Sequence, residues 1–200
     1  MRFIFFGPPG SGKSVQGFAL SSKWEIPYIS VGEILHEAIA RRTPLGIKAE
    51  QYMESGELAP DYLIIGLLRE RLMKADASKG WILDGCPCNQ SQFEALDSLL
   101  TNLKQPYDQV VSFYVPFNVL VERLLARGRF DDGLEIINKR LSIYWEYTAP
   151  LIQEFQKRRC LTVVNGERPV EVITQFLITS FESQPPQPKI NRILSQKTRV

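Results

Sequence analysis

A glycine-rich loop directly after an N-terminal apolar strand constrains this chain more than any other feature. Residues 7–14 read Gly-Pro-Pro-Gly-Ser-Gly-Lys-Ser and match the pattern G-x-x-x-x-G-K-[ST] in full. The apolar run 2–6 precedes the loop, and a helical pattern follows it. Backbone N–H groups of such a loop point inward, and the helix N-terminus adds partial positive charge. We therefore expect a phosphate-binding loop that holds ATP.

Individual side chains around the loop have predicted tasks. Lys13 would reach the β- and γ-phosphates, and the Ser14 hydroxyl could ligate Mg²⁺. A loop that merely turns the chain is disfavoured, because a lysine here adds little to packing. Asp84 ends an apolar strand, where it can hold Mg²⁺ through water; alone it could equally be a turn or cap. The predicted ATP-binding residues are Gly10, Ser11, Gly12, Lys13, Ser14, Val15 and Arg123.

Strand and helix patterns alternate along the rest of the chain. Strands are expected at 2–6, 27–29, 81–83, 110–115 and 161–164, and helices at about 12–22, 31–42, 46–55, 61–75, 89–103, 117–127, 134–157 and 168–181. This order predicts an α/β, three-layer fold with a central parallel sheet of about five strands flanked by helices. We expect one domain over residues 1–182.

Composition adds limits on compartment and partners. The longest apolar stretches are too short to span a bilayer and no signal-peptide layout follows Met1, so we expect a soluble, cytoplasmic chain. The net charge of +2 depends on four basic residues of a Pro-containing tail, 183–200, leaving 20 basic against 22 acidic groups elsewhere. Nucleic-acid binding is therefore not expected except through the tail, and a flexible terminus without a task is favoured even there. The four are Lys189, Arg192, Lys197 and Arg199.

Three cysteines, Cys86, Cys88 and Cys160, are interpreted as plain thiols. Their number is odd and no export signal is evident, which argues against a disulfide framework. No Cys/His pair with zinc-like spacing accompanies them, so no structural zinc is predicted.

Five sequence blocks, taken in order, resemble the adenylate kinase and nucleoside monophosphate kinase family over nearly all of residues 1–182. The blocks are the phosphate-binding loop with Gln16, residues 29–35, residues 56–61, residues 83–87 with Gln92, and residues 123–150. The resemblance implies an ATP- and Mg²⁺-dependent transferase that moves a γ-phosphoryl group to a nucleoside monophosphate, AMP foremost, and releases two diphosphates. It also implies a monomer with a helical acceptor-binding segment, 31–60, and a lid, 127–133.

The block from residue 123 onward carries most of the implied catalysis. By resemblance, Arg123 would lie on the adenine, while Arg127, Arg129 and Arg140 would neutralise phosphate oxygens in transit. Asp131 and Asp132 would fix the arginines or the closed lid. Phosphoryl transfer needs positioned positive charge more than covalent chemistry, and arginine bonds phosphate bidentately. Any one arginine could be a solvated helix face, but the set favours function.

The implied lid is very short. Only Gly128 separates Arg127 from Arg129, where even short-lid relatives have several residues. Such a loop should exclude water less fully and open faster. It also lacks the cysteines with which some long-lid relatives bind zinc.

The acceptor side departs from the family pattern. The implied acceptor-binding residues are Val31, His36, Gly56, Leu58, Gly85 and Gln92, yet His36 and Cys88 stand where the family has phosphate-binding arginines and Val31 replaces a threonine. Each lost charge-assisted contact is worth about 1.5–3 kcal/mol. His36 could bind phosphate as imidazolium, Arg41, Arg42 or Arg69 could reach in, or the acceptor could be different.

Two further functions stay open at this stage. The chain could be an ATP-binding relative with an altered acceptor or without transferase activity, which the replaced arginines favour. A small-molecule kinase on a related fold is disfavoured, because such an enzyme has no reason to carry both Gln92 and the block at 56–61.

Overall fold

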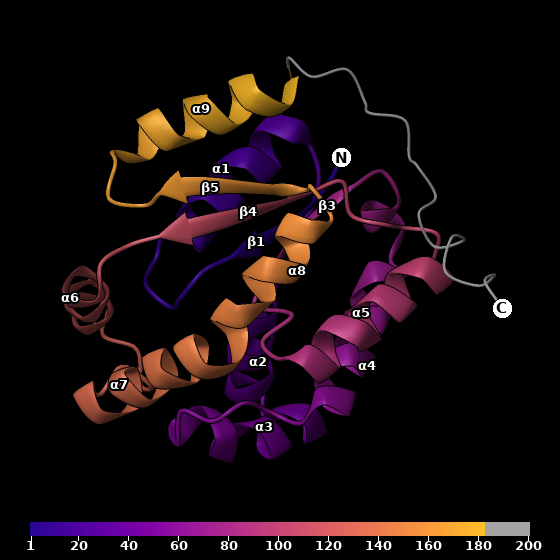
Figure 1. Cartoon of the computed structure of the whole chain (residues 1–200). Helices are drawn as coiled ribbons and strands as arrows, with labels where there is room; N and C mark the ends of the chain where they lie inside the picture. The colour runs from indigo at the N-terminus through magenta and orange to yellow at the C-terminus, as the bar shows by residue number, and fades with distance from the viewer. Residues whose placement is uncertain (183–200) are drawn as a thin grey trace, which may run out of the picture.

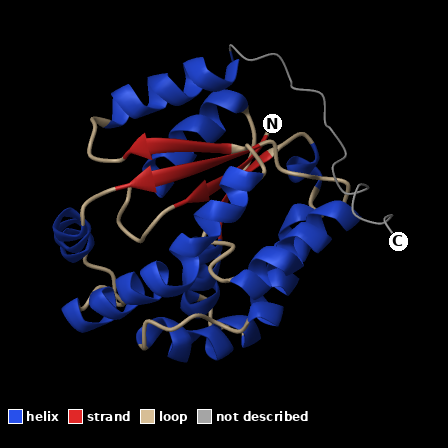
Figure 2. Ribbon diagram, viewed as in Figure 1, coloured by secondary structure: helices blue, strands red, loops and turns tan. Residues whose placement is uncertain are grey.

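Five parallel strands form the centre of the computed structural model, which describes residues 1–182. The predicted tail 183–200 lies outside the described residues. The spatial order is β2-β3-β1-β4-β5, with helices on both faces of the sheet (Figure 1; Figure 2). The predicted α/β fold with a parallel sheet and flanking helices is confirmed. The strands are β1 Arg2–Phe6, β2 Tyr28–Ser30, β3 Trp81–Asp84, β4 Gln109–Tyr114 and β5 Leu161–Asn165.

Helices follow the strands in the alternation that the sequence predicts. Their bounds are α1 Lys13–Trp24, α2 Val31–Ala40, α3 Pro44–Glu54, α4 Asp61–Leu72, α5 Gln90–Asn102, α6 Phe117–Arg127, α7 Leu134–Ile143, α8 Ile152–Lys157 and α9 Val170–Glu182. Ser30, Thr43 and Asn89 cap α2, α3 and α5 by accepting a hydrogen bond from the third residue beyond them. These caps explain why the chain turns into a helix at each of these points.

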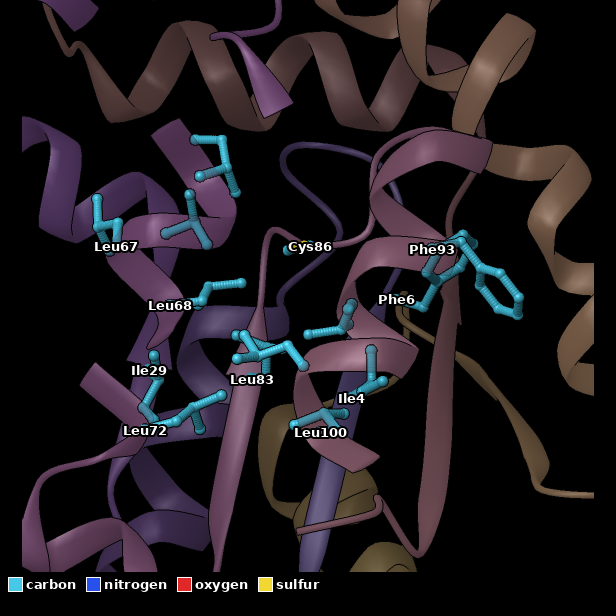
Figure 3. Packing of buried hydrophobic residues seen from close by; sticks show 14 of the residues in the cluster. Ile4, Phe6, Ile29, Leu67, Leu68, Leu72, Leu83, Cys86, Phe93 and Leu100 are labelled. Carbon is cyan, nitrogen blue, oxygen red and sulfur yellow. The ribbon is translucent and has the colours of Figure 1, made fainter. Parts of the chain in front are cut away.

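The two faces of the sheet have separate hydrophobic cores. Alternate residues of β1 point to opposite faces, as strand geometry requires. Phe3 and Phe5 pack with residues of α1 and α9, whereas Ile4 and Phe6 pack with α4, α5 and α8. Figure 3 shows part of the second core, where Leu68 and Leu83 lie near Ile29 and Leu72. The sheet is thereby fixed between two helical layers.

One helix that the sequence predicts as continuous is interrupted in the structure. The span 134–157 was expected as a single helix, but α7 ends at Ile143 and α8 begins at Ile152. A π-helical turn, 144–148, and a 3-10 turn, 149–151, lie between them. Pro150 has no N–H and its ring crowds the carbonyl four residues earlier, so a regular α-helix cannot pass through it.

Two further observations concern the whole described chain. None of its helices is both long enough and apolar enough to cross a bilayer. Cys86 is buried, Cys88 and Cys160 are partly exposed, and all three are free thiols.

Candidate functional site

A pocket of about 650 Å³ lies at the carboxyl ends of the central strands. Open parallel sheets place their ligand sites at this edge. The phosphate-binding loop follows β1, Asp84 ends β3, and α2 begins directly after β2, so three neighbouring strands deliver their polar ends to one place. The arginines of α6, α7 and the segment between them line the same pocket.

The loop 7–14 has the backbone that its glycines permit. Gly10 has φ 81° and Gly12 has φ 92°, in the left-handed region that favours glycine. Gly12 is the N-cap of α1, and no side chain occupies that cap. The N–H groups that begin the helix are therefore available to an anion, as the sequence motif predicts.

Lys13 is folded back over its own loop. Its Nζ donates to the carbonyl oxygens of Gly7 at 2.8 Å and Pro8 at 2.9 Å, and lies 3.9 Å from Oδ1 of Asp84. Burial lowers the pKa of Lys13, and the nearby Asp84 carboxylate opposes that shift. The ammonium group lines the pocket, and a phosphate oxygen could take the place of the Gly7 and Pro8 carbonyls as its hydrogen-bond acceptor.

The segment 127–133, which the sequence resemblance predicts to be a lid, is organised by two buried carboxylates. Arg127 donates to both oxygens of Asp132 at 2.8 and 2.7 Å, and the Arg129 backbone N–H donates to the same side chain at 3.1 Å. Arg140 of α7 donates to Oδ2 of Asp131 at 3.0 Å. Burial alone would raise the pKa of Asp132, but the bonds from Arg127 and Arg129 lower it. Asp132 is thus an anion that holds the lid turn together.

Arg129 has its partner on a different element. Its guanidinium is paired with Glu33 of α2, which connects the lid segment to the 31–60 segment. Both side chains are partly exposed, so solvent screens this pair. The contact orients Arg129 across the pocket mouth.

Arg123 of α6 lies at the end of the pocket beside the turn after β5. Its guanidinium donates to the carbonyl oxygen of Gly166 at 3.0 Å. Gly166 and the exposed Arg168 line the same end of the pocket. This places a planar cation and a backbone turn next to each other, and Gly166 also packs closely against the Ser11 carbonyl of the phosphate-binding loop.

His36 faces the lid. Its Nε2 lies 3.8 Å from Oδ2 of Asp131, and the ring of Phe130 packs edge-on at 5.3 Å. Burial lowers the pKa of His36, while Asp131 and Glu33 act in the opposite direction. The other oxygen of Asp131, Oδ1, is buried and has no hydrogen-bond partner among the described residues.

Cys88 and Gln92 belong to one hydrogen-bonded turn. The Cys88 backbone N–H donates to Oε1 of Gln92 at 2.8 Å, and Nε2 of Gln92 donates to Asp61 at 2.9 Å. Thr148 donates to the Cys88 carbonyl at 2.6 Å. Burial raises the pKa of the Cys88 thiol to about 11, so the thiol stays neutral and donates to Gly85.

The structure brings almost all the predicted site residues to one pocket. Of the predicted set, only Asp132 does not line it, because its carboxylate is turned toward Arg127. Three residues suggested as replacements for the acceptor arginines do not line the pocket: Arg41, Arg42 and Arg69. Arg41 is paired with Glu37 and Arg42 with Glu50 on the outer surface.

Sequence reasoning missed four residues near the site: Tyr28, Glu33, Thr148 and Arg168. Glu33 follows Ser30 by three residues, a spacing that reads as helix capping. Tyr28 and Thr148 act through partners that are 56 and 60 positions away in sequence, so no local signal could identify them. Arg168 could have been found as a cation at the start of the helix predicted at 168–181, just after the Asn-Gly turn signal at 165–166.

Comparison with known proteins decides the family. A profile of the family described as adenylate kinase matches residues 5–160. The chain belongs to the adenylate kinase family. It is 47% identical over 182 residues to adenylate kinase 1 of Nostoc sp. These aligned residues make up 91% of this chain and 99% of that protein. It is 49% identical over 174 residues to adenylate kinase 1 of Synechocystis sp., with coverage of 87% and 93%. Adenylate kinase of Cyanothece sp. is 45% identical over 177 residues, 86% of this chain and 91% of that protein. Membership in the adenylate kinase family makes this chain a phosphotransferase of the nucleoside monophosphate kinase type.

Proposed function

We propose that this chain transfers the γ-phosphoryl group of ATP reversibly to AMP and releases two molecules of ADP. The observation that carries the proposal is the convergence of Lys13, the loop 7–14 and three lid arginines on one pocket. The relatives named above are adenylate kinases, which supports AMP as the acceptor. We further propose that the enzyme acts as a cytoplasmic monomer without membrane or nucleic-acid partners.

The donor nucleotide would lie between the loop and Arg123. Backbone N–H groups from Gly10 to Val15 would bind its β-phosphate, and Lys13 would exchange the Gly7 and Pro8 carbonyls for phosphate oxygens. Arg123 would pack on the adenine. This assignment uses a loop conformation that needs no rearrangement of the glycines.

The residues at the end of β3 and the start of α1 fit a magnesium ion. Mg²⁺ takes oxygen ligands and keeps several waters beside one or two carboxylates. Asp84 supplies a buried carboxylate and Ser14 a hydroxyl, both at the pocket floor. Bound there, Mg²⁺ would neutralise charge on the transferring phosphates. No zinc is proposed for the lid.

Arg127, Arg129 and Arg140 would stabilise the charge that moves during transfer. Little covalent chemistry is required, so positioned cations in a site that excludes water supply most of the catalysis. Asp131 and Asp132 would keep these guanidinium groups in place while one face of each turns to phosphate. The short lid 127–133 would close over the donor.

The acceptor would bind against the segment 31–60 and the turn after β3. Val31, His36, Gly56, Leu58, Gly85 and Gln92 line this half of the pocket. Gln92 would read the acceptor base, which requires its present bonds to Cys88 and Asp61 to yield in part. His36 and Cys88 leave this half with less fixed positive charge than the donor half.

A coupled assay of ADP formation with AMP, GMP, CMP and UMP tests the proposal. AMP should give the highest rate, and Lys13→Ala should lower the rate by roughly 10²- to 10³-fold, the typical cost of one transition-state donor. Lys23→Ala is the matched control, because Lys23 lies on the same helix but is exposed and outside the pocket.

One outcome would favour a second function. If no acceptor is turned over faster than by the Lys13→Ala variant, the transferase proposal is wrong. Calorimetry that then finds tight ATP binding without AMP binding would identify an ATP-binding relative. The observation that motivates this alternative is the pair His36 and Cys88 in the acceptor half.

A further inference from the structure

The hydroxyl of Tyr28 lies directly behind Asp84. It donates to Oδ2 of that carboxylate at 2.6 Å, while Oδ1 faces Lys13 at 3.9 Å. One carboxylate oxygen of Asp84 is therefore bound by Tyr28 of β2, and the other faces Lys13 in the pocket. Tyr28 itself does not line the pocket. Any effect of Tyr28 on a bound nucleotide must pass through Asp84.

Packing holds the ring of Tyr28 in place independently of its hydroxyl. A Cβ at Gly17 would lie 2.3 Å from the ring, so α1 approaches Tyr28 as closely as a glycine allows. Phe18 packs edge-on against the same ring with centroids 4.8 Å apart. In the sheet, Tyr28 pairs with Ile82 and Ser30 with Asp84. Removal of the hydroxyl alone should leave the ring where it is.

The chemical state of the phenol suits a permanent donor. Burial and the Asp84 carboxylate both raise its pKa, so it carries its proton throughout the working pH range. The hydroxyls of Ser14 and Ser30 are close enough to act on the same group, and each lowers its pKa. The Tyr28 hydroxyl thus stays a donor to Asp84, one of the two residues proposed to hold Mg²⁺.

We propose that Tyr28 is a positioning residue for the metal–nucleotide complex. It orients Asp84 so that Oδ1 faces the pocket, and it fixes the spacing between Asp84 and the start of α1. Partners behind metal-associated ligands commonly change metal affinity by 10- to 100-fold when removed. The inference rests on the proposed function. It gives a role in nucleotide binding to Tyr28, a residue that does not itself line the pocket.

Tyr28→Phe is the variant that tests this task. Isothermal calorimetry of ATP binding is run with excess Mg²⁺ and again with EDTA, and the Mg²⁺ concentration for half-maximal activity is measured in parallel. We expect the variant to need roughly tenfold more Mg²⁺ and to lose most of the affinity that Mg²⁺ adds to ATP. Binding in EDTA should equal that of the wild type, since the loop and Lys13 are untouched.

Tyr107→Phe is the matched control. Tyr107 is also a partly buried tyrosine whose hydroxyl has one strong partner, Arg158 at 2.7 Å, but it lies in the core beside Phe155. A Tyr28→Phe variant with wild-type Mg²⁺ dependence would overturn the positioning role. So would equal losses with Mg²⁺ and with EDTA, which indicate a general structural defect. A wild-type protein that binds no ATP at all would instead overturn the proposed function.

Discussion

His36 is one of two residues, with Cys88, that stand where the family resemblance implies a phosphate-binding arginine. Its imidazole lies 3.8 Å from Asp131, and its other charged neighbours are Glu33, Arg127 and Arg129. The loss of solvent outweighs the nearby carboxylates, so the pKa of His36 is lowered. The ring is therefore mainly neutral at pH 7, and an imidazolium for the acceptor phosphate would form only at more acidic pH.

The lowered pKa of His36 makes the stability of the folded chain depend on pH. Below its ordinary pKa of about 6.5, His36 takes up a proton in the unfolded chain before it does so in the folded chain. Its contribution to stability is therefore lost as the pH falls below about 6.5. We expect urea unfolding between pH 7.5 and 5 to show a smaller pH slope for His36→Gln than for the wild type. His36 is the sole histidine of the sequence, so one NMR titration also reports its pKa without assignment. A pKa above 6.5 would contradict the prediction.

At the scale of elements, the lid depends on a buried Arg–Asp pair. Asp132 accepts two bonds from Arg127 and one from the Arg129 backbone, and only 1% of its side chain is exposed. Asp132→Asn should lower the free energy of unfolding by about 1–3 kcal/mol, because it leaves a partly buried guanidinium without its anion. The lid arginines should also lose their orientation, with a lower kcat.

The chain contains a matched control for this variant. Arg71 and Asp76 have the same sequence separation and the same pair of bonds, at 2.9 and 2.8 Å, but Asp76 is 53% exposed. Asp76→Asn should cost less than about 1 kcal/mol, since solvent screens surface pairs. If chemical denaturation showed the same loss in the free energy of unfolding for both variants, burial of the Arg127–Asp132 pair would add nothing to stability.

Elements were more predictable than their contacts. The strand ends and most helix ends could be predicted within a few residues, because Pro, Asp and Asn mark them locally. The split between α7 and α8 could not, since residues 144–149 keep a helical pattern and only the backbone shows where Pro150 takes effect. The partners of Gln92, Asp84 and Arg129 come from elements far away in sequence, so the alternation of strands and helices cannot reveal them.

At the scale of the whole molecule, positive charge is distributed unevenly over the pocket. The proposed donor and lid sides are lined by Lys13, Arg123, Arg127, Arg129 and Arg140, whereas the proposed acceptor half has His36 and Cys88. Arg41 and Arg42, which follow α2, and Arg69 of α4 do not compensate, because they do not line the pocket. The acceptor half must therefore obtain affinity from the base and sugar, or bind its phosphate through the lid cations.

Restoring charge to the acceptor half tests this division. The double variant His36→Arg with Cys88→Arg should strengthen AMP binding by at least about tenfold, since each charge-assisted phosphate contact is worth about 1.5–3 kcal/mol. ATP affinity, measured by the same calorimetry, should change little, because the loop and Arg123 are untouched. Gln90→Arg adds one of these two positive charges at an exposed position outside the pocket, two residues from Cys88, and controls for general attraction of anions. If that control strengthens AMP binding as much as the double variant does, long-range charge explains the gain. If the double variant leaves AMP binding unchanged, the acceptor phosphate does not bind at His36 and Cys88, and the lid arginines become its expected partners.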